Sequence, residues 1–155
     1  MDYKLSNHDA VIDKLNQILG HELSGVVRYT HYSFMVFGYS RIPVTEWFRS
    51  AADETLRHAT EAGEMITFFG EHPGLGIGDL LESHKHDMRD ILMEAMEFEL
   101  QGVDMYRELL ALVEQEDAIF VVEYARQKIA EESQHIGEID KMLRQPGDIA
   151  RAVQT

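Results

Sequence analysis

The 155 residues, 45% of them hydrophobic, are enough for one domain with its own core, so we expect a single domain over residues 1–155. The net charge of −14 argues against nucleic acid or an anionic membrane as a partner. The chain has no cysteine, which excludes disulfides, thiolate metal sites and cysteine nucleophiles.

The N-terminal residues show no apolar run after a basic start, and the sequence nowhere has 18 consecutive apolar residues. We therefore expect no secretory signal, no membrane span and a cytoplasmic protein. The first helix is expected over residues 8–38, with Ser6 or Asn7 as its N-cap. Its apolar residues recur at helical spacing, and Glu22 falls on that apolar stripe, where a carboxylate needs a partner.

The second helix is expected to begin at Pro43 and to end at Gly70. Its apolar stripe includes two polar residues, Glu54 and His58. Residues 71–84 contain three glycines and a proline and form the longest non-helical stretch. Fourteen extended residues reach at most roughly 46 Å, and a 27-residue helix is roughly 40 Å long. This segment can therefore cross the length of a bundle and let the third helix start at the same end as the second.

The third and fourth helices are expected over residues 85–114 and 118–144, followed by a short C-terminal tail. Glu99 lies on the apolar stripe of the third helix, and Glu132 and His135 lie on that of the fourth. No strand pattern occurs in the sequence. The prediction is an all-α four-helix bundle made of two antiparallel hairpins joined by a long crossover.

An internal repeat connects these polar residues. The pattern E-L-x-G-V-x-x-Y begins at both Glu22 and Glu99, and a histidine follows each glutamate after 36 positions, His58 and His135. The midpoint of each Glu/His pair, residue 40 or residue 117, falls in the turn between the two helices of its hairpin. The glutamate and histidine of each hairpin are therefore expected to face one another at one level of the bundle.

Two carboxylate helices opposite two Glu/His helices can hold two metal ions inside a bundle. Carboxylates can bridge two ions, and each imidazole gives one ion a neutral nitrogen. Oxygen-rich ligation without sulfur favours iron, with manganese as the alternative, over a structural zinc. Two adjacent ferrous ions can each give one electron to dioxygen or hydrogen peroxide.

The whole chain resembles the ferritin-like superfamily and is most similar to bacterioferritin. The similar stretches are residues 15–23, 99–102 and 131–136 and the segment from His58 to Pro73. The resemblance implies a ferroxidase site built by Glu22, Glu99, Glu132, His58 and His135, with Tyr29 nearby. It also implies a homo-oligomer, a hollow cage that stores ferric mineral.

The sequence departs from the family pattern in the second helix. The motif E-x-x-H is present as Glu132 to His135, but the matching position before His58 is Thr55. Glu54 shares a helix face with His58. Either Glu54 serves as a metal ligand in place of the absent carboxylate, or one bridging carboxylate is missing and metal binds weakly or asymmetrically. The haem-binding methionine of bacterioferritin would fall at Leu56, so haem is not expected.

The function expected from these residues is oxidation of Fe(II) to Fe(III) for storage or detoxification. The alternatives are another di-metal oxidoreductase on the same bundle and a non-catalytic assembly subunit with a degenerate site. Glu131 is expected beside the ligands or in solvent rather than as a ligand. His84 and His86 are expected to be surface residues, because they lie where the crossover meets the third helix.

Overall fold

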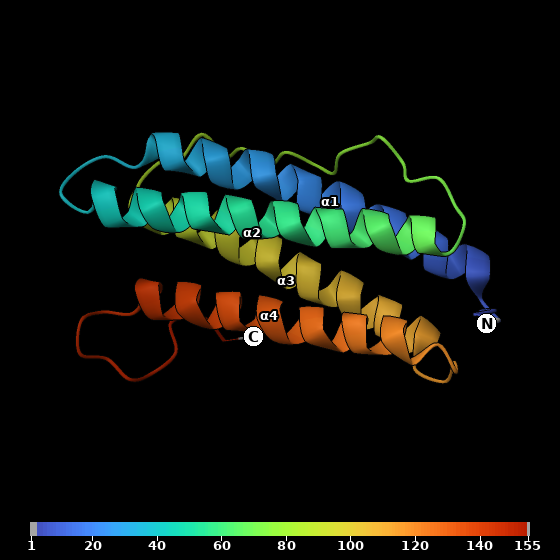
Figure 1. Cartoon of the computed structure of the whole chain (residues 1–155). Coiled ribbons are helices and arrows are strands. Elements are labelled where there is room, and N and C mark those ends of the chain that lie inside the picture. The colour runs from blue at the N-terminus through green and yellow to red at the C-terminus, as the bar shows by residue number, and fades with distance from the viewer. Residues whose placement is uncertain (1–2, 155) are drawn as a thin grey trace.

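A computed structural model of the chain, which describes residues 3–154, has four helices and no strand in that range. The helices are α1 (His8–Met35), α2 (Arg41–Phe68), α3 (Met88–Val113) and α4 (Ile119–Leu143). Helices α1 and α2 form one antiparallel hairpin, and α3 and α4 form the other, side by side with the first (Figure 1). The predicted all-α four-helix bundle is therefore confirmed. Within the described range, no helix combines the length and apolarity that a membrane span requires.

The helix ends differ from the predicted ones by a few residues. Helix α1 stops at Met35 instead of residue 38, because Val36 is already extended, with φ −84° and ψ 118°. Helix α3 starts at Met88 instead of residue 85, because the side chain of Asp87 accepts a hydrogen bond from the Asp90 N–H at 3.0 Å. Asn7 occupies the N-cap position of α1, but its side chain makes no capping bond.

The crossover, residues 69–87, runs along α1 from one end of the bundle to the other, so that α2 and α3 are parallel (Figure 1). Gly70, with φ +83°, ends α2 in the left-handed region. Farther along, the Gly78 N–H donates to the carbonyl oxygen of Gly20 at 2.7 Å. A Cβ on Gly78 would lie 3.2 Å from that oxygen, so glycine permits this close approach of the crossover to α1.

The apolar core consists of two clusters, one toward each end of the bundle. One contains Leu15, Ile66, Leu109 and Val121, and the other contains Tyr29, Phe48, Ile91 and Ile139. Every helix contributes to both clusters. The polar residues singled out by the repeat lie between them, at the middle of the bundle.

Candidate metal centre

The repeat brings five side chains together at the centre of the bundle. Glu22, His58, Glu99 and Glu132 are 1–3% exposed, and the His135 side chain is 20% exposed. Each of the four helices contributes at least one of these residues. Buried carboxylates are tolerated only when they are paired or neutralised, so this cluster needs positive charge, either protons or cations.

Glu132 lies between the two histidines, one carboxylate oxygen toward each ring. Its Oε1 is 2.6 Å from His58 Nδ1, and its Oε2 is 3.6 Å from His135 Nδ1. Each of the other two carboxylates lies near one ring only. Glu22 Oε1 is 3.7 Å from His58 Nδ1, and Glu99 Oε2 is 3.6 Å from His135 Nδ1. A carboxylate in this position could bridge two ions, each also near one imidazole and one further carboxylate.

Several of these inward-facing atoms make no hydrogen bond. Within the described residues, Glu99 Oε2 is buried without a hydrogen bond, and His58 Nδ1 and Glu132 Oε1, although 2.6 Å apart as an ion pair, make no hydrogen bond of regular geometry. Buried polar atoms almost always make hydrogen bonds, so inward-facing atoms that make none leave coordination positions for a cation. A nitrogen and two carboxylate oxygens suit a divalent cation.

The outward-facing nitrogens of the two rings are held by a second pair of glutamates. Glu131 Oε2 is 2.8 Å from His58 Nε2, and Glu54 Oε2 is 2.9 Å from His135 Nε2. Each glutamate thus contacts the histidine of the opposite hairpin. A carboxylate that accepts the Nε2–H fixes the tautomer and leaves Nδ1 free for a metal ion.

Glu54 therefore lies on the far side of the imidazole from Glu132. The position that matches Glu132 in the repeat is Thr55, whose hydroxyl donates to the Ala51 carbonyl at 2.7 Å, within its own helix. The inner side of the centre thus has three carboxylates and two imidazoles. A role for Glu54 as a metal ligand remains a prediction, and its contacts favour an orienting role.

Two tyrosines cross-link the carboxylates of the repeats. Tyr29 donates to Glu99 Oε1, and Tyr106 donates to Glu22 Oε1 at 2.8 Å. Each tyrosine therefore bonds the glutamate of the other repeat. Burial raises the pKa of both hydroxyls, with the neighbouring glutamate adding to the effect, so both remain protonated donors at neutral pH. Tyr106 therefore occupies a position equivalent to that of Tyr29, and each tyrosine can hold one carboxylate of the centre in place.

A cationic group beside the centre was not predicted. The Lys128 side chain is 1% exposed, and its Nζ is 2.9 Å from Glu131 Oε2 and also pairs with Glu61. Arg57 Nη2 lies 3.1 Å from the same Glu131 oxygen. Burial alone would raise the pKa of Glu131, but Lys128, Gln127 and Arg57 lower it to about 2. Lys128 lies one heptad before His135 and therefore on the same face of the helix, which is the feature of the sequence that could have placed it near the centre.

In the metal-free state, protons take the place of metal charge. Burial alone would lower the histidine pKa values, but Glu132 and Glu22 raise that of His58 to about 10. In the same way, Glu132 and Glu99 raise the pKa of His135 to about 11. Both imidazoles are therefore in the cationic, doubly protonated form near pH 7, and a metal ion that binds a ring must displace one of its protons.

We expect the metal affinity of the metal-free protein to increase as pH rises from 6.5 toward 9. Each displaced proton contributes about one decade of affinity per pH unit while pH lies below the folded-state pKa. Calorimetric titration with Zn(II) at pH 6.5 and 7.5, in buffers of different ionisation enthalpy, measures both the affinity and the protons released. Binding that releases no protons would contradict the assigned protonation.

A glycine in each repeat makes room for a pair of stacked rings. The His21 and Phe98 rings are nearly parallel, 9° apart, with centroids separated by 4.2 Å. Gly25 faces Phe98, and Gly102 faces His21. Because these rings immediately precede Glu22 and Glu99, the stack fixes how α1 and α3 present their carboxylates.

Comparison with known proteins agrees with this architecture. The sequence model of the family described as Ferritin-like domain matches residues 12–147, whereas no curated protein matches the chain. A ferritin-like, diiron-carboxylate protein from Bacillus anthracis superposes with a TM-score of 0.85 at 23% identity, covering 91% of this chain and 100% of its own. A dodecameric thioferritin, the bacterioferritin-related protein of Bacteroides fragilis, gives 0.79 at 22% identity, covering 87% and 84%. With the family match extending over most of its length, the chain belongs to the ferritin-like domain family.

Proposed function

We propose that this protein is a ferroxidase, which binds two Fe(II) ions at the bundle centre and oxidises them. The observation that carries the proposal is the position of Glu132, with one oxygen toward each imidazole Nδ1 and a further carboxylate, Glu22 or Glu99, beside that same nitrogen. In the reaction, two Fe(II) ions lose one electron each to dioxygen, which takes up two protons and leaves as hydrogen peroxide. Hydrogen peroxide as the oxidant would take the same two electrons and two protons and leave as water.

Each residue has a defined task in this proposal. Glu22 with His58 and Glu99 with His135 bind one ion each, and Glu132 bridges the two ions. The three carboxylates balance three of the four positive charges of two ferrous ions. Two apolar clusters enclose the centre from both ends and restrict access by water. Tyr29 and Tyr106 hold the terminal carboxylates in place.

The experiment that tests the proposal is anaerobic titration of the metal-free protein with Fe(II), followed by addition of oxygen. We expect saturation near two ions per chain and ferric absorbance that develops faster than in buffer. Saturation at one ion or none, with oxidation no faster than in buffer, would contradict the proposal. That outcome would support a non-catalytic subunit, the alternative that the absent carboxylate at Thr55 favours.

Glu54→Gln tests whether Glu54 orients His135 or binds metal. If it orients the ring, we expect Fe(II) affinity to fall by about tenfold while two ions still bind, because an amide is a weaker acceptor for the imidazole N–H. Glu64→Gln, an exposed position on the same helix, is the control. Loss of one whole ion from the Glu54→Gln variant would instead establish Glu54 as a ligand.

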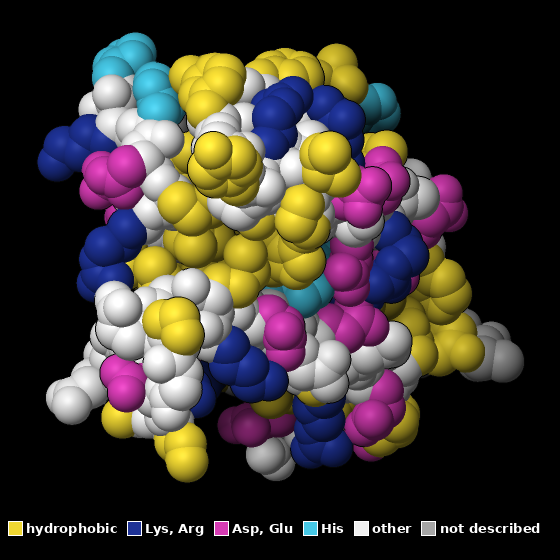
Figure 2. Space-filling model, turned by 90° about the vertical axis from the view of Figure 1, so that its left-hand side faces the viewer, with side chains coloured by type: hydrophobic (Ala, Val, Ile, Leu, Met, Phe, Trp, Pro, Cys, Tyr) yellow, Lys and Arg dark blue, Asp and Glu magenta, His cyan; other side chains and the backbone are white. Residues whose placement is uncertain are grey.

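We further propose that copies of the chain assemble. Large apolar side chains gather at the end of the bundle where α1 ends and α2 begins, including Phe37 at 70% and Ile42 at 74% exposure (Figure 2). Such a patch is typical of an interaction surface, and a structural neighbour is described as dodecameric. Sedimentation of a 17.8 kDa monomer at micromolar concentration would contradict assembly.

A further inference from the structure

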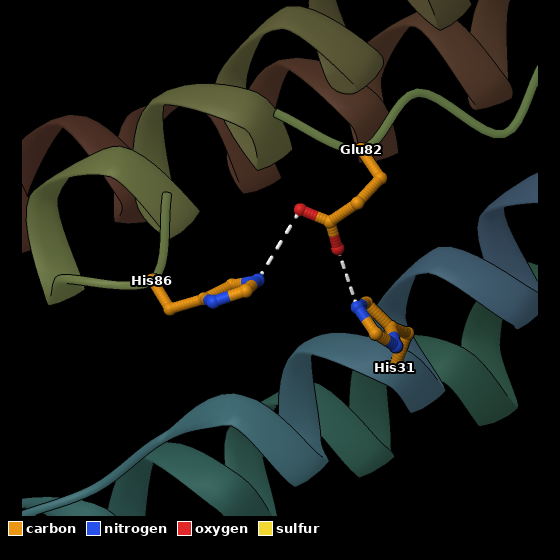
Figure 3. Close-up of side chains that lie close together, drawn as sticks. All are labelled: His31, Glu82 and His86. Atoms are coloured by element: carbon orange, nitrogen blue, oxygen red, sulfur yellow. Dashed lines mark hydrogen bonds and ion pairs between the residues drawn. The ribbon is translucent and has the colours of Figure 1, made fainter. Parts of the chain in front are cut away.

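A second group of metal-binding side chains lies where the crossover reaches α3. His31 extends from α1, and Glu82 and His86 extend from the last residues of the crossover (Figure 3). Glu82 lies between the two rings, with Oε2 at 2.5 Å from His31 Nε2 and Oε1 at 3.3 Å from His86 Nε2. One atom from each residue falls within 4.8 Å of the other two. None of the three belongs to the centre in the bundle.

The local backbone holds Glu82 and His86 on the same side of the chain. His84 has φ +56° and is the one non-glycine residue of the described chain in the left-handed region. Its N–H donates to Glu82 Oε1 at 2.6 Å. The turn is fastened to α3 by a bond from the Ser83 N–H to Glu94 Oε1 at 2.9 Å. Glu82 and His86 therefore approach α1 from a turn that is held in place by hydrogen bonds.

The exposure of the group leaves room for further ligands. The side chains are 44%, 25% and 32% exposed for His31, Glu82 and His86. His86 Nε2 itself is shielded and lacks a hydrogen-bond partner among the described residues, although it faces the carboxylate. Two imidazole nitrogens and one carboxylate oxygen are three protein ligands of the kind that zinc and ferrous iron take, with water at the open positions.

We propose that His31, Glu82 and His86 form a separate binding site for a divalent transition-metal ion such as Zn(II) or Fe(II). The bound ion would link α1 to the end of the crossover, two segments that are 51 residues apart between His31 and Glu82. It would therefore fasten the crossover over α1 close to the start of α3. This proposal departs from the expectation that His86 is only a surface residue.

Crystals of the protein soaked in Zn(II) and measured at the zinc absorption edge test the site directly. We expect an anomalous peak about 2.0–2.2 Å from both Nε2 atoms and from a Glu82 oxygen. The double variant His31→Ala/His86→Ala should lose that peak and bind one Zn(II) fewer per chain by equilibrium dialysis. His72→Ala, an exposed histidine of the same crossover, should match the wild type. A wild type without this peak, or a double variant with unchanged stoichiometry, would overturn the proposal.

Limited trypsin digestion provides a second readout, because Lys85 is exposed and lies between two of the ligands. At a Zn(II) concentration ten times the dissociation constant of the site, mass action predicts about tenfold slower cleavage after Lys85. The wild type and His72→Ala should show this protection, and the double variant should not. Protection that persists in the double variant would assign the effect to the bundle centre and contradict the proposed link.

Discussion

Replacing Glu132 with alanine is expected to weaken metal binding in both halves of the bundle centre at once. Glu132 is the carboxylate that reaches both imidazoles, at 2.6 Å from His58 Nδ1 and 3.6 Å from His135 Nδ1. Loss of a residue that only supports a ligand already costs about 10–100-fold in metal affinity. Loss of the bridging ligand should therefore cost at least about 100-fold for each ion and abolish rapid Fe(II) oxidation.

The comparison with Glu22→Ala makes this prediction specific. Glu22 faces His58, so its removal should affect one ion much more than the other. Glu123→Ala, an exposed carboxylate on the same helix as Glu132, is the control and should bind as the wild type does. Anaerobic Fe(II) titration and the initial rate after oxygen addition distinguish the three variants. Selective loss of a single ion from Glu132→Ala would show that this carboxylate does not bridge.

Helical periodicity and the repeat were sufficient to predict the fold and the level of the centre. An amphipathic helix must bury its apolar stripe, so the polar residues on four such stripes are forced into one interior. The midpoint of each Glu/His pair, residue 40 or residue 117, falls in the turn of its hairpin, which puts the two residues of each hairpin at one height. The length of the crossover predicted the parallel arrangement of α2 and α3, which the structure confirms.

The sequence could not distinguish the inner from the outer carboxylates. An offset of 77 residues relates Glu54 to Glu131 and Thr55 to Glu132, and both Glu54 and Glu131 lie on the Nε2 side of the histidines. Which ring nitrogen faces inward depends on side-chain rotation, which spacing along a helix does not determine. Glu131 was expected beside the ligands or in solvent, and the structure places it beside His58, with Oε2 2.8 Å from Nε2.

Contacts between segments far apart in the chain also could not be predicted from the sequence. The heptad spacing to His135 puts Lys128 on the face of the helix that carries the ligands, but it does not identify its partner Glu61, which belongs to the other hairpin. His31 and Glu82 are brought together only by the path of the crossover over α1. Such pairs have no periodic signature, because they depend on how two distant segments of the chain pack against each other.

Gly25→Ala is expected to destabilise the protein by about 2 kcal/mol, whereas Gly102→Ala should be neutral or stabilise it by up to about 1 kcal/mol. Both glycines lie inside helices, where alanine is the better helix former. The two positions differ in the space available for a Cβ atom. A Cβ on Gly25 would overlap the Phe98 ring and lie 2.7 Å from Thr55 Cγ2, whereas a Cβ on Gly102 would lie 3.4 Å from its nearest neighbour, His21 Nε2.

The two variants occupy equivalent positions of the repeat, so each serves as the other's control. Chemical denaturation of the metal-free proteins, with the midpoint and slope determined for each, measures the two changes in free energy of unfolding. Because Phe98 precedes Glu99 and stacks on His21, Gly25→Ala should also displace the carboxylate and weaken metal binding. Equal changes in the free energy of unfolding would show that the stacked rings can move to accommodate a methyl group at either glycine. In that case, the tight contact of α1 with Phe98 would not determine the position of Glu99.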